Sequence, residues 1–215
     1  MRASKTPRAL ACIGGALALL AALGCGGRPT AEDSSPIDVS MAPEQGRLED
    51  PTPVKVSASG WDFVITPTAR YVLRGVVVSR ETYSSGWNAA LSPCDVAMAW
   101  GELAADEGWR KLGWSQAYRW YRWQWRGQAP FSKEVIVRNS SNTHIVPATP
   151  NVGRAACSLS EGDLAELSGE LIRIDGRSGD HWVRWVSSLS RDDTGDGSCE
   201  LLYLRRLRVN GKVYE

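Results

Sequence analysis

The sequence predicts a mainly β protein of the α+β class with two short helices. Segments rich in β-branched and aromatic residues, separated by turn residues, dominate the chain after residue 60. Asn210-Gly211 between short apolar runs is the pair most typical of a tight hairpin. The ten Trp all lie in this part, and about 155 residues suffice for one buried core.

We expect strands over eight ranges: 61–66, 71–79, 116–126, 134–138, 144–148, 164–174, 181–189 and 200–209. One helix is expected over 92–105, because Ser92 offers an N-cap and Pro93 suits the first helical position. The second helix is expected between Pro150 and Ser160.

Two glycines interrupt predicted strands and suggest how the sheet is shaped. Gly75 and Gly169 lie inside apolar runs, where glycine marks a bulge or a sharp bend. Bent strands with only small helices favour a small barrel, OB-like or SH3-like, and a sandwich is the alternative.

The N-terminus has the pattern of a cleaved export signal. A basic start is followed by an apolar run of about 15 residues, too short to cross a bilayer comfortably. The run ends in Ala22-Leu23-Gly24-Cys25, which resembles the lipobox of bacterial lipoproteins. The resemblance implies a signal peptide over 1–24 and acylation of Cys25, which would hold the protein on a membrane. An ordinary secretory signal is the alternative.

The remaining domain organisation follows from composition. Residues 25–59 are rich in Pro, Ser, Thr and acidic side chains, so we expect an acylated Cys25 followed by a disordered tether. Residues 60–215 form the expected globular β-rich domain. Gly26 after the cysteine favours the outer membrane, with the domain facing the periplasm.

The charge balance argues against nucleic acid as a partner. The formal net charge is +1, and removal of Arg2, Lys5 and Arg8 with the leader leaves 22 basic against 24 acidic residues, a net of −2. Recognition of phosphates requires a basic surplus, which this chain lacks.

Three cysteines follow the predicted anchor. An oxidising compartment predicts one disulfide, and Cys94 with Cys157 is the preferred pair because it would join the two predicted helical segments. Cys199 would then remain a thiol.

The acidic run 192–197 allows three interpretations. Asp193-Thr194-Gly195 matches the triplet of aspartic proteases, but polar residues precede it, whereas that triplet follows apolar strand residues. The alternating acids also match half of a calcium loop, but Tyr203 stands where a bidentate carboxylate belongs. A turn between two strands is the preferred interpretation.

Two histidines, His144 and His181, lack the spacing of a zinc site, and we expect no metal and no cofactor. His144 follows a polar loop and begins an apolar strand. With Asp193 or Cys199 beside it, His144 would form the minimal set for acid–base or nucleophilic catalysis. A structural, hydrogen-bonded histidine is the preferred alternative.

The run 118–126 is the densest in aromatic and basic residues. As one strand it would place Trp120 and Arg122 on one face and Arg119 and Trp123 on the other. Trp beside Arg suits stacking on sugars, although Arg stems covering an aromatic core would give the same pattern. The candidate ligand-binding residues are Arg119, Trp120, Arg122, Trp123, Asn142 and Arg191.

Several short motifs together resemble an uncharacterised family of bacterial exported proteins. They are Ser92-Pro93-x-Asp95, Trp100-Gly101, Ser115-Gln116-x-x-Arg119-x-Tyr121, Ser141-Asn142-x-His144-x-x-Pro147-Ala148, Ser187-Ser188-x-x-Arg191-Asp192-Asp193-Thr194-Gly195 and Cys199-Glu200. The resemblance implies no activity. It suggests that the polar residues of these motifs converge on a pocket, namely Ser115, Arg119, Asn142, His144, Arg191, Asp193 and Glu200.

Two functions from different classes follow. The first is a non-enzymatic envelope lipoprotein that binds a glycan such as peptidoglycan, a peptide or an envelope protein through the 118–126 strand. The second is a hydrolase-like enzyme that uses His144 with Asp193 or Cys199.

Overall fold

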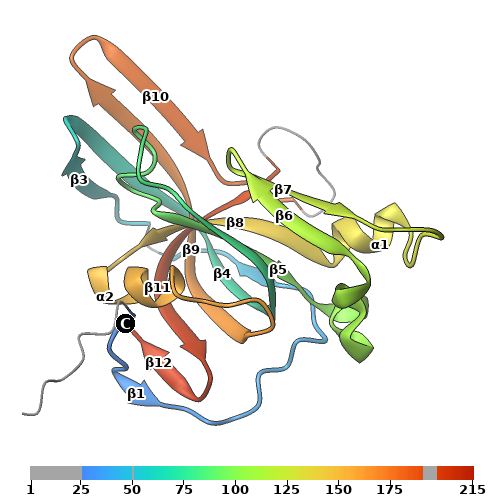
Figure 1. The fold of residues 1–215 in the computed structure, drawn as a ribbon. Helices are drawn as coiled ribbons and strands as arrows, with labels where there is room; N and C mark the ends of the chain where they lie inside the picture. The colour runs from blue at the N-terminus through green and yellow to red at the C-terminus, as the bar shows by residue number, and fades with distance from the viewer. Residues whose placement is uncertain (1–25, 50, 191–197) are drawn as a thin grey trace, which may run out of the picture.

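The computed structural model describes residues 26–49, 51–190 and 198–215. Most of these residues form one ten-stranded sheet, and a separate two-stranded hairpin covers one side of it (Figure 1). The predicted class, mainly β with short helices, is confirmed. The predicted leader 1–24, Cys25 and the acidic run 192–197 lie outside the described residues.

The strands of the large sheet are β1 Ala31–Glu32, β2 Glu44–Gly46, β3 Val54–Ala58, β4 Trp61–Thr82, β5 Cys94–Ala99, β8 Ser140–Pro147, β9 Leu164–Ser178, β10 His181–Val186, β11 Glu200–Val209 and β12 Lys212–Tyr214. The hairpin consists of β6 Gly113–Ala117 and β7 Trp120–Gln124. The helices are α1 Lys133–Arg138, α2 Pro150–Ala156 and two 3-10 segments, η1 Gly101–Leu103 and η2 Ala105–Lys111.

Five strands of the sheet pair in a closed circuit, β4–β5–β8–β11–β9 and back to β4. Within it β8 and β11 run parallel, and the other four pairs are antiparallel. This connectivity is that of an OB-like Greek-key barrel and not of the SH3-like or sandwich alternatives. The molecule is nevertheless not a clean barrel, because β3, β10 and the long ends of β4 and β9 extend from the circuit as an open sheet (Figure 1).

The predicted glycine bends lie where strands cross closely. A Cβ at Gly169 would lie 2.1 Å from the carbonyl oxygen of Tyr203, beside the register shift between Leu204 and Arg206. A Cβ at Gly75 would lie 2.7 Å from the carbonyl oxygen of Ala99. Both positions therefore require a residue without a side chain, because neighbouring backbones of the circuit occupy the space.

The helix predicted over 92–105 is wrong. Residues Cys94–Ala99 form β5, and all six are buried. Cys94, Val96 and Met98 pack in one hydrophobic cluster, whereas Ala97 and Ala99 pack in another on the opposite face. A strand covered on both faces has a continuous apolar run, which periodicity alone does not distinguish from a buried helix. Ser92-Pro93, the pair that predicted the start of a helix, therefore precedes a strand.

The strand predicted over 134–138 is also wrong, since these residues belong to α1. Ser132 is its N-cap, and the Ser132 Oγ accepts a hydrogen bond of 3.2 Å from the amide of Val135. The β-branched residues of this helix had favoured a strand, and the cap outweighs them. The helix predicted after Pro150 is confirmed as α2.

The single strand predicted over 116–126 is a hairpin. The turn between β6 and β7 consists of Tyr118 and Arg119, whose φ angles are +54° and +70°. Two consecutive left-handed residues make the tight turn that matches strand twist, for which Asn-Gly is usual. Asn210-Gly211 forms such a turn between β11 and β12, as predicted.

The disordered tether predicted over 25–59 is wrong for its described residues. β1 pairs with β12, while β2 and β3 both pair with β4. Buried Glu166 helps to hold this segment, because it accepts from Arg74 at 2.6 Å, and Arg74 also contacts Glu44 of β2. Backbone pairing and ion pairs with the rest of the domain hold this segment in place. The composition of the segment does not reveal these contacts.

A disulfide joins Cys94 and Cys157, with their Cα atoms 5.7 Å apart. This is the pairing that the sequence favoured, although it connects a strand and the end of α2 and not two helices. Among the described residues, no helix is long and apolar enough to cross a bilayer.

We predict that Gly169→Ala destabilises the protein by about 1–3 kcal/mol, because the new methyl group overpacks the crossing at Tyr203. Gly46→Ala is the matched control, since a Cβ there meets only the Cβ of Arg70 at 4.0 Å. Urea unfolding of both variants measures the difference. Equal stabilities would contradict the tight crossing.

Candidate functional site

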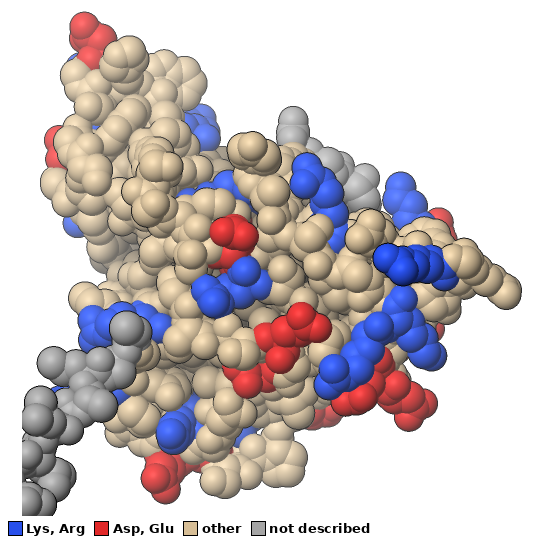
Figure 2. All heavy atoms as spheres, viewed as in Figure 1, with Lys and Arg blue, Asp and Glu red and all other residues tan. Residues whose placement is uncertain are grey.

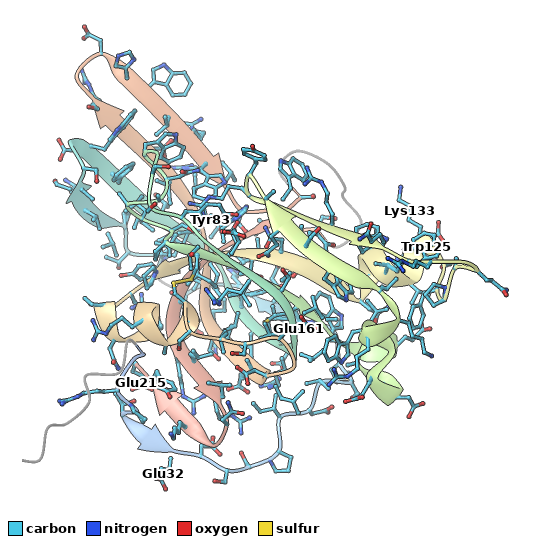
Figure 3. The ribbon with its side chains drawn as sticks, viewed as in Figure 1. Glu32, Tyr83, Trp125, Lys133, Glu161 and Glu215 are labelled. Atoms are coloured by element: carbon cyan, nitrogen blue, oxygen red, sulfur yellow. A yellow bond between two sulfur atoms is a disulfide. The ribbon has the colours of Figure 1, made fainter. Side chains whose placement is uncertain are left out.

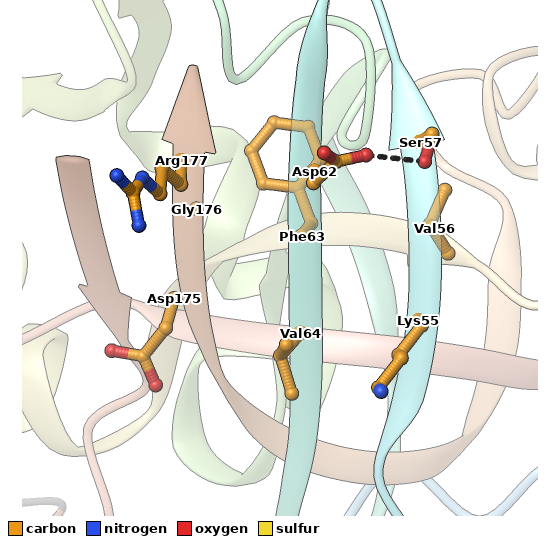
Figure 4. A pocket seen from close by; sticks show the side chains of 9 residues that line it. All are labelled: Lys55, Val56, Ser57, Asp62, Phe63, Val64, Asp175, Gly176 and Arg177. Atoms are coloured by element: carbon orange, nitrogen blue, oxygen red, sulfur yellow. Dashed lines mark hydrogen bonds between the residues drawn. The ribbon is translucent and has the colours of Figure 1, made fainter. Parts of the chain in front are cut away.

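Of the hollows that the described residues form, two are candidates for a site. The larger, about 450 Å³, lies on the face of β3, β4 and β9, and Figure 4 shows its lining side chains. Ser57 donates to Asp62 there at 2.5 Å, and Asp175 accepts from Arg173 and Arg184 of neighbouring positions. Its polar groups thus pair with one another along an open sheet face and do not converge on an enclosed space.

The smaller hollow, about 240 Å³, is lined by aromatic and basic side chains from separate parts of the chain. They come from the loop after β4, the β6–β7 hairpin, β8, β10 and the residue before β11. The lining residues are Trp87, Asn88, Arg119, Trp120, His144, Arg184, Trp185, Val186 and Cys199. Convergent polar groups in an aromatic pocket are the usual signature of a binding site, and we name this hollow the tryptophan pocket.

Behind the pocket lies a buried carboxylate. Asp95 of β5 is fully buried, and its Oδ1 accepts a 2.7 Å hydrogen bond from the Nη1 of Arg119. The Nδ1 of His144, on the paired strand β8, is 3.0 Å from the same oxygen. This second contact is close but is not aligned as a hydrogen bond. Arg119 therefore supplies the main compensation for the buried charge.

The guanidinium of Arg119 has further partners besides Asp95. Its Nη1 and Nη2 donate to the hydroxyl and the carbonyl oxygen of Ser92, at 3.1 and 2.8 Å. The guanidinium carbon lies 3.7 Å from the ring centroid of Tyr83 and 5.6 Å from that of Trp185. Such stacking between two aromatic rings adds cation–π attraction to the ion pair.

The backbone of Arg119 is also fixed, which keeps a strained turn in place. Its carbonyl oxygen accepts from the Nδ2 of Asn142 at 3.0 Å, and its amide donates to the hydroxyl of Tyr83 at 3.2 Å. Gln116 in turn donates to the Oδ1 of Asn142 at 2.6 Å. Left-handed backbone at Tyr118 and Arg119 is unfavourable for these residue types, so the surrounding contacts must hold it.

Tyr83 remains a neutral phenol beside this ion pair (Figure 3). Burial first, and then the negative charge of Asp95, raise the pKa of Tyr83 to about 12. At neutral pH its hydroxyl therefore keeps its proton while accepting from the Arg119 amide.

The structure brings together some of the predicted site residues. Arg119, Trp120, His144 and Cys199 line the tryptophan pocket. Asn142 was predicted to bind a ligand directly, but it is buried and is not among the lining residues. Its side chain supports the hairpin by donating to the carbonyl oxygen of Arg119.

Other predicted residues lie elsewhere. Arg122 is exposed on β7 outside the pocket lining, and half-buried Trp123 packs with Tyr121 on the opposite face of that strand. Ser115 is exposed, and Glu200 is buried beside Thr143. Arg191 and Asp193 lie outside the described residues.

Sequence reasoning missed Asp95, Tyr83, Trp87 and Trp185 as parts of the site. One signal was available, because a carboxylate within the apolar run of β5 is seldom buried without a cationic partner. The two tryptophans carried no such signal. They meet edge-on, with centroids 5.8 Å apart, only because the loop after β4 folds back toward β10.

Within the described residues, no group of three or more His, Cys, Asp or Glu is arranged to hold a metal ion. Comparison of the chain with protein-family models, with curated proteins and with solved structures finds no match.

We predict that Asp95→Ala lowers the free energy of unfolding by about 3–5 kcal/mol, because it leaves the charge of Arg119 buried and uncompensated. Asp175→Ala is the control. It removes a surface acid that also contacts two arginines, and the expected loss is about 1 kcal/mol or less. Urea unfolding compares them, and equal losses would contradict a central role for the buried pair.

Proposed function

We propose that the protein is an envelope-anchored, non-enzymatic binding module whose tryptophan pocket takes a saccharide unit of an envelope glycan. The observation that carries this proposal is the convergence of Trp87, Trp120 and Trp185 with Arg119 in one pocket. Indole faces offer large, rigid surfaces for sugar rings, and the guanidinium group supplies directional donors.

The charge of the lining favours a glycan that bears carboxylates. Arg119 and Arg184 contribute to the wall, and no Asp or Glu is among the lining residues that the structure describes. Of the acids that pair with these arginines, Asp95 is buried behind the wall, whereas Asp175 lines the larger hollow. The described wall thus carries guanidinium groups without a carboxylate beside them, which suits acceptor-rich ligands such as the carboxylated sugars of peptidoglycan.

The place of the pocket on the fold supports the same proposal by analogy. In OB-like barrels, the face of the second and third strands and the loops next to them accommodate oligosaccharides or oligonucleotides. Here His144 of β8, the third circuit strand, lines the pocket together with the loop after β4 and the β10 segment, and Asp95 of the paired second strand, β5, lies behind it.

A polyanionic nucleic acid fits this surface less well. Figure 2 shows Lys and Arg interspersed with Asp and Glu over the visible face, with no continuous basic stripe. The net of −2 after removal of the leader agrees with this pattern.

The location belongs to the proposal as well. The leader pattern and Cys25 support export and acylation, and Gly26 favours the outer membrane with the domain in the periplasm. In that compartment a peptidoglycan strand, another glycan or a glycan-bearing envelope protein is the available partner.

We predict that muropeptide fragments change the tryptophan fluorescence of the full chain saturably, and that Trp120→Ala weakens their affinity about tenfold or more, or 1.4 kcal/mol. Trp182→Ala is the matched control, since Trp182 is 75% exposed and outside the pocket lining. Neutral chitooligosaccharides should bind more weakly than muropeptides. Equal losses in both tryptophan variants would contradict the assignment of the pocket.

A hydrolase-like enzyme is the second candidate, and one observation favours it. His144 contacts a carboxylate through Nδ1, and Cys199 lines the same pocket outside the disulfide. A nucleophile, a base and an acid that orients the base is the general pattern of covalent catalysis. Among the described residues, Asp95 is the carboxylate beside His144. Asp193 lies outside them.

Alkylation of Cys199 by iodoacetamide at neutral pH separates the two candidates. For a binding module we expect equal rates in the wild type and in His144→Gln, because no base activates the thiol. A rate that falls more than tenfold in the variant, with its near-UV circular dichroism unchanged, would favour the hydrolase. Mass spectrometry locates and quantifies the adduct.

A further inference from the structure

The described chain begins with a segment that lies directly on α2. The amide of Arg28 donates to the Oδ1 of Asn151 at 2.7 Å, and the Nδ2 of Asn151 donates back to the carbonyl oxygen of Arg28 at 2.9 Å. The same Nδ2 also donates to the carbonyl oxygen of Glu215 at 3.1 Å. One side chain thus ties the first described residues to α2 and to the end of the chain.

Gly27 shows how close this approach is. A Cβ at Gly27 would lie 2.6 Å from the carbonyl oxygen of Asn151 and 2.9 Å from the Cβ of Ala155. Only glycine lets the backbone contact the helix so closely. The amide of Thr30 then donates to Val213 at 2.7 Å, and β1 continues the pairing with β12.

These contacts hold the chain in place only a few residues after the predicted acylation site. The inference drawn from them rests on the acylation of Cys25 in the proposed function. Only Gly26 and Gly27 separate Cys25 from the clamped Arg28. An extended residue spans at most about 3.6 Å, so the acylated residue stays within roughly 10 Å of α2. Acyl chains inserted in a bilayer therefore bring this side of the domain to the membrane surface.

We propose that the domain rests directly on the bilayer through the surface formed by Arg28, Asn151, Arg154 and Ser158, without a flexible tether. Arg28 and Arg154 are exposed and suit the phosphates of lipid headgroups. Glu32 and Glu215 border the same side (Figure 3). The acidic neighbours limit the affinity of the surface itself, so the acyl chains hold the protein and the surface sets its orientation.

The orientation has a consequence for the tryptophan pocket. In Figure 1, α2, β12 and the C-terminus lie at the lower left, whereas β10 and the tip of the β6–β7 hairpin lie at the top. Seated on α2, the domain presents the pocket away from its own membrane. A fixed orientation of this kind suits capture of a ligand that lies at a set height above the bilayer.

The test uses the full chain, processed in a bacterial host and returned to vesicles of phosphatidylethanolamine and phosphatidylglycerol that contain a nitroxide-labelled lipid. A fluorescent amino acid replaces either Arg154, on the proposed surface, or Tyr118, which is 88% exposed at the hairpin tip. We expect at least threefold stronger quenching at position 154 than at 118. The mass of the N-terminal peptide reports the acylation of Cys25.

A flexible linker makes the matched control. Twenty Gly and Ser residues inserted between Gly26 and Gly27 give a reach of roughly 25 Å and should remove most of the difference between the two positions. Equal quenching at both positions in the acylated chain would overturn the proposal, and so would an unacylated Cys25. Muropeptide binding is measured separately, so failure of the orientation is distinguishable from failure of the glycan site.

Discussion

The buried charge of Asp95 is the constraint on which the rest of the site depends. A carboxylate with no exposed surface inside a barrel strand requires a cationic partner, because an uncompensated buried charge is strongly destabilising. Arg119 meets that requirement from a hairpin that belongs to the connection between β5 and β8. The ion pair thereby docks the hairpin over the barrel and brings Trp120 to the edge of the pocket.

The turn that carries Arg119 has an unfavourable backbone conformation. Tyr118 and Arg119 both adopt left-handed conformations that suit Asn or Gly, and contacts from Asn142 and Tyr83 hold the turn. A strained turn that is fixed on all sides is preorganised, so a ligand entering the pocket need not order it. A site for a small saccharide requires rigid aromatic walls that lose little conformational entropy on binding, because one sugar ring offers little surface to bind.

The N-terminal segment, at the other end of the domain, is also fixed by contacts with the rest of the fold. Residues 26–49 have the composition of a disordered linker, yet backbone pairing with β12 and β4 and the ion pairs of Arg74 and Arg208 hold them on the surface. The pKa of Asp33 is lowered chiefly by hydrogen bonds from Ser35, and the charges of Arg208 and Arg206 act in the same direction. The proposed binding pocket and the first described residues, next to the predicted acylation site, are thus held in one fold.

The sequence by itself determined the β-rich class, the Asn210-Gly211 hairpin and α2, because each depends on residues adjacent in the chain. It also indicated Arg119, Trp120 and His144, though not the partner that unites them. Only the tertiary structure decided that Cys94–Ala99 is a strand, that the Trp and Arg run bends at Tyr118, and that the N-terminal segment is ordered. Each of these depends on pairing or charge compensation between residues far apart in the chain, and local patterns do not encode such contacts.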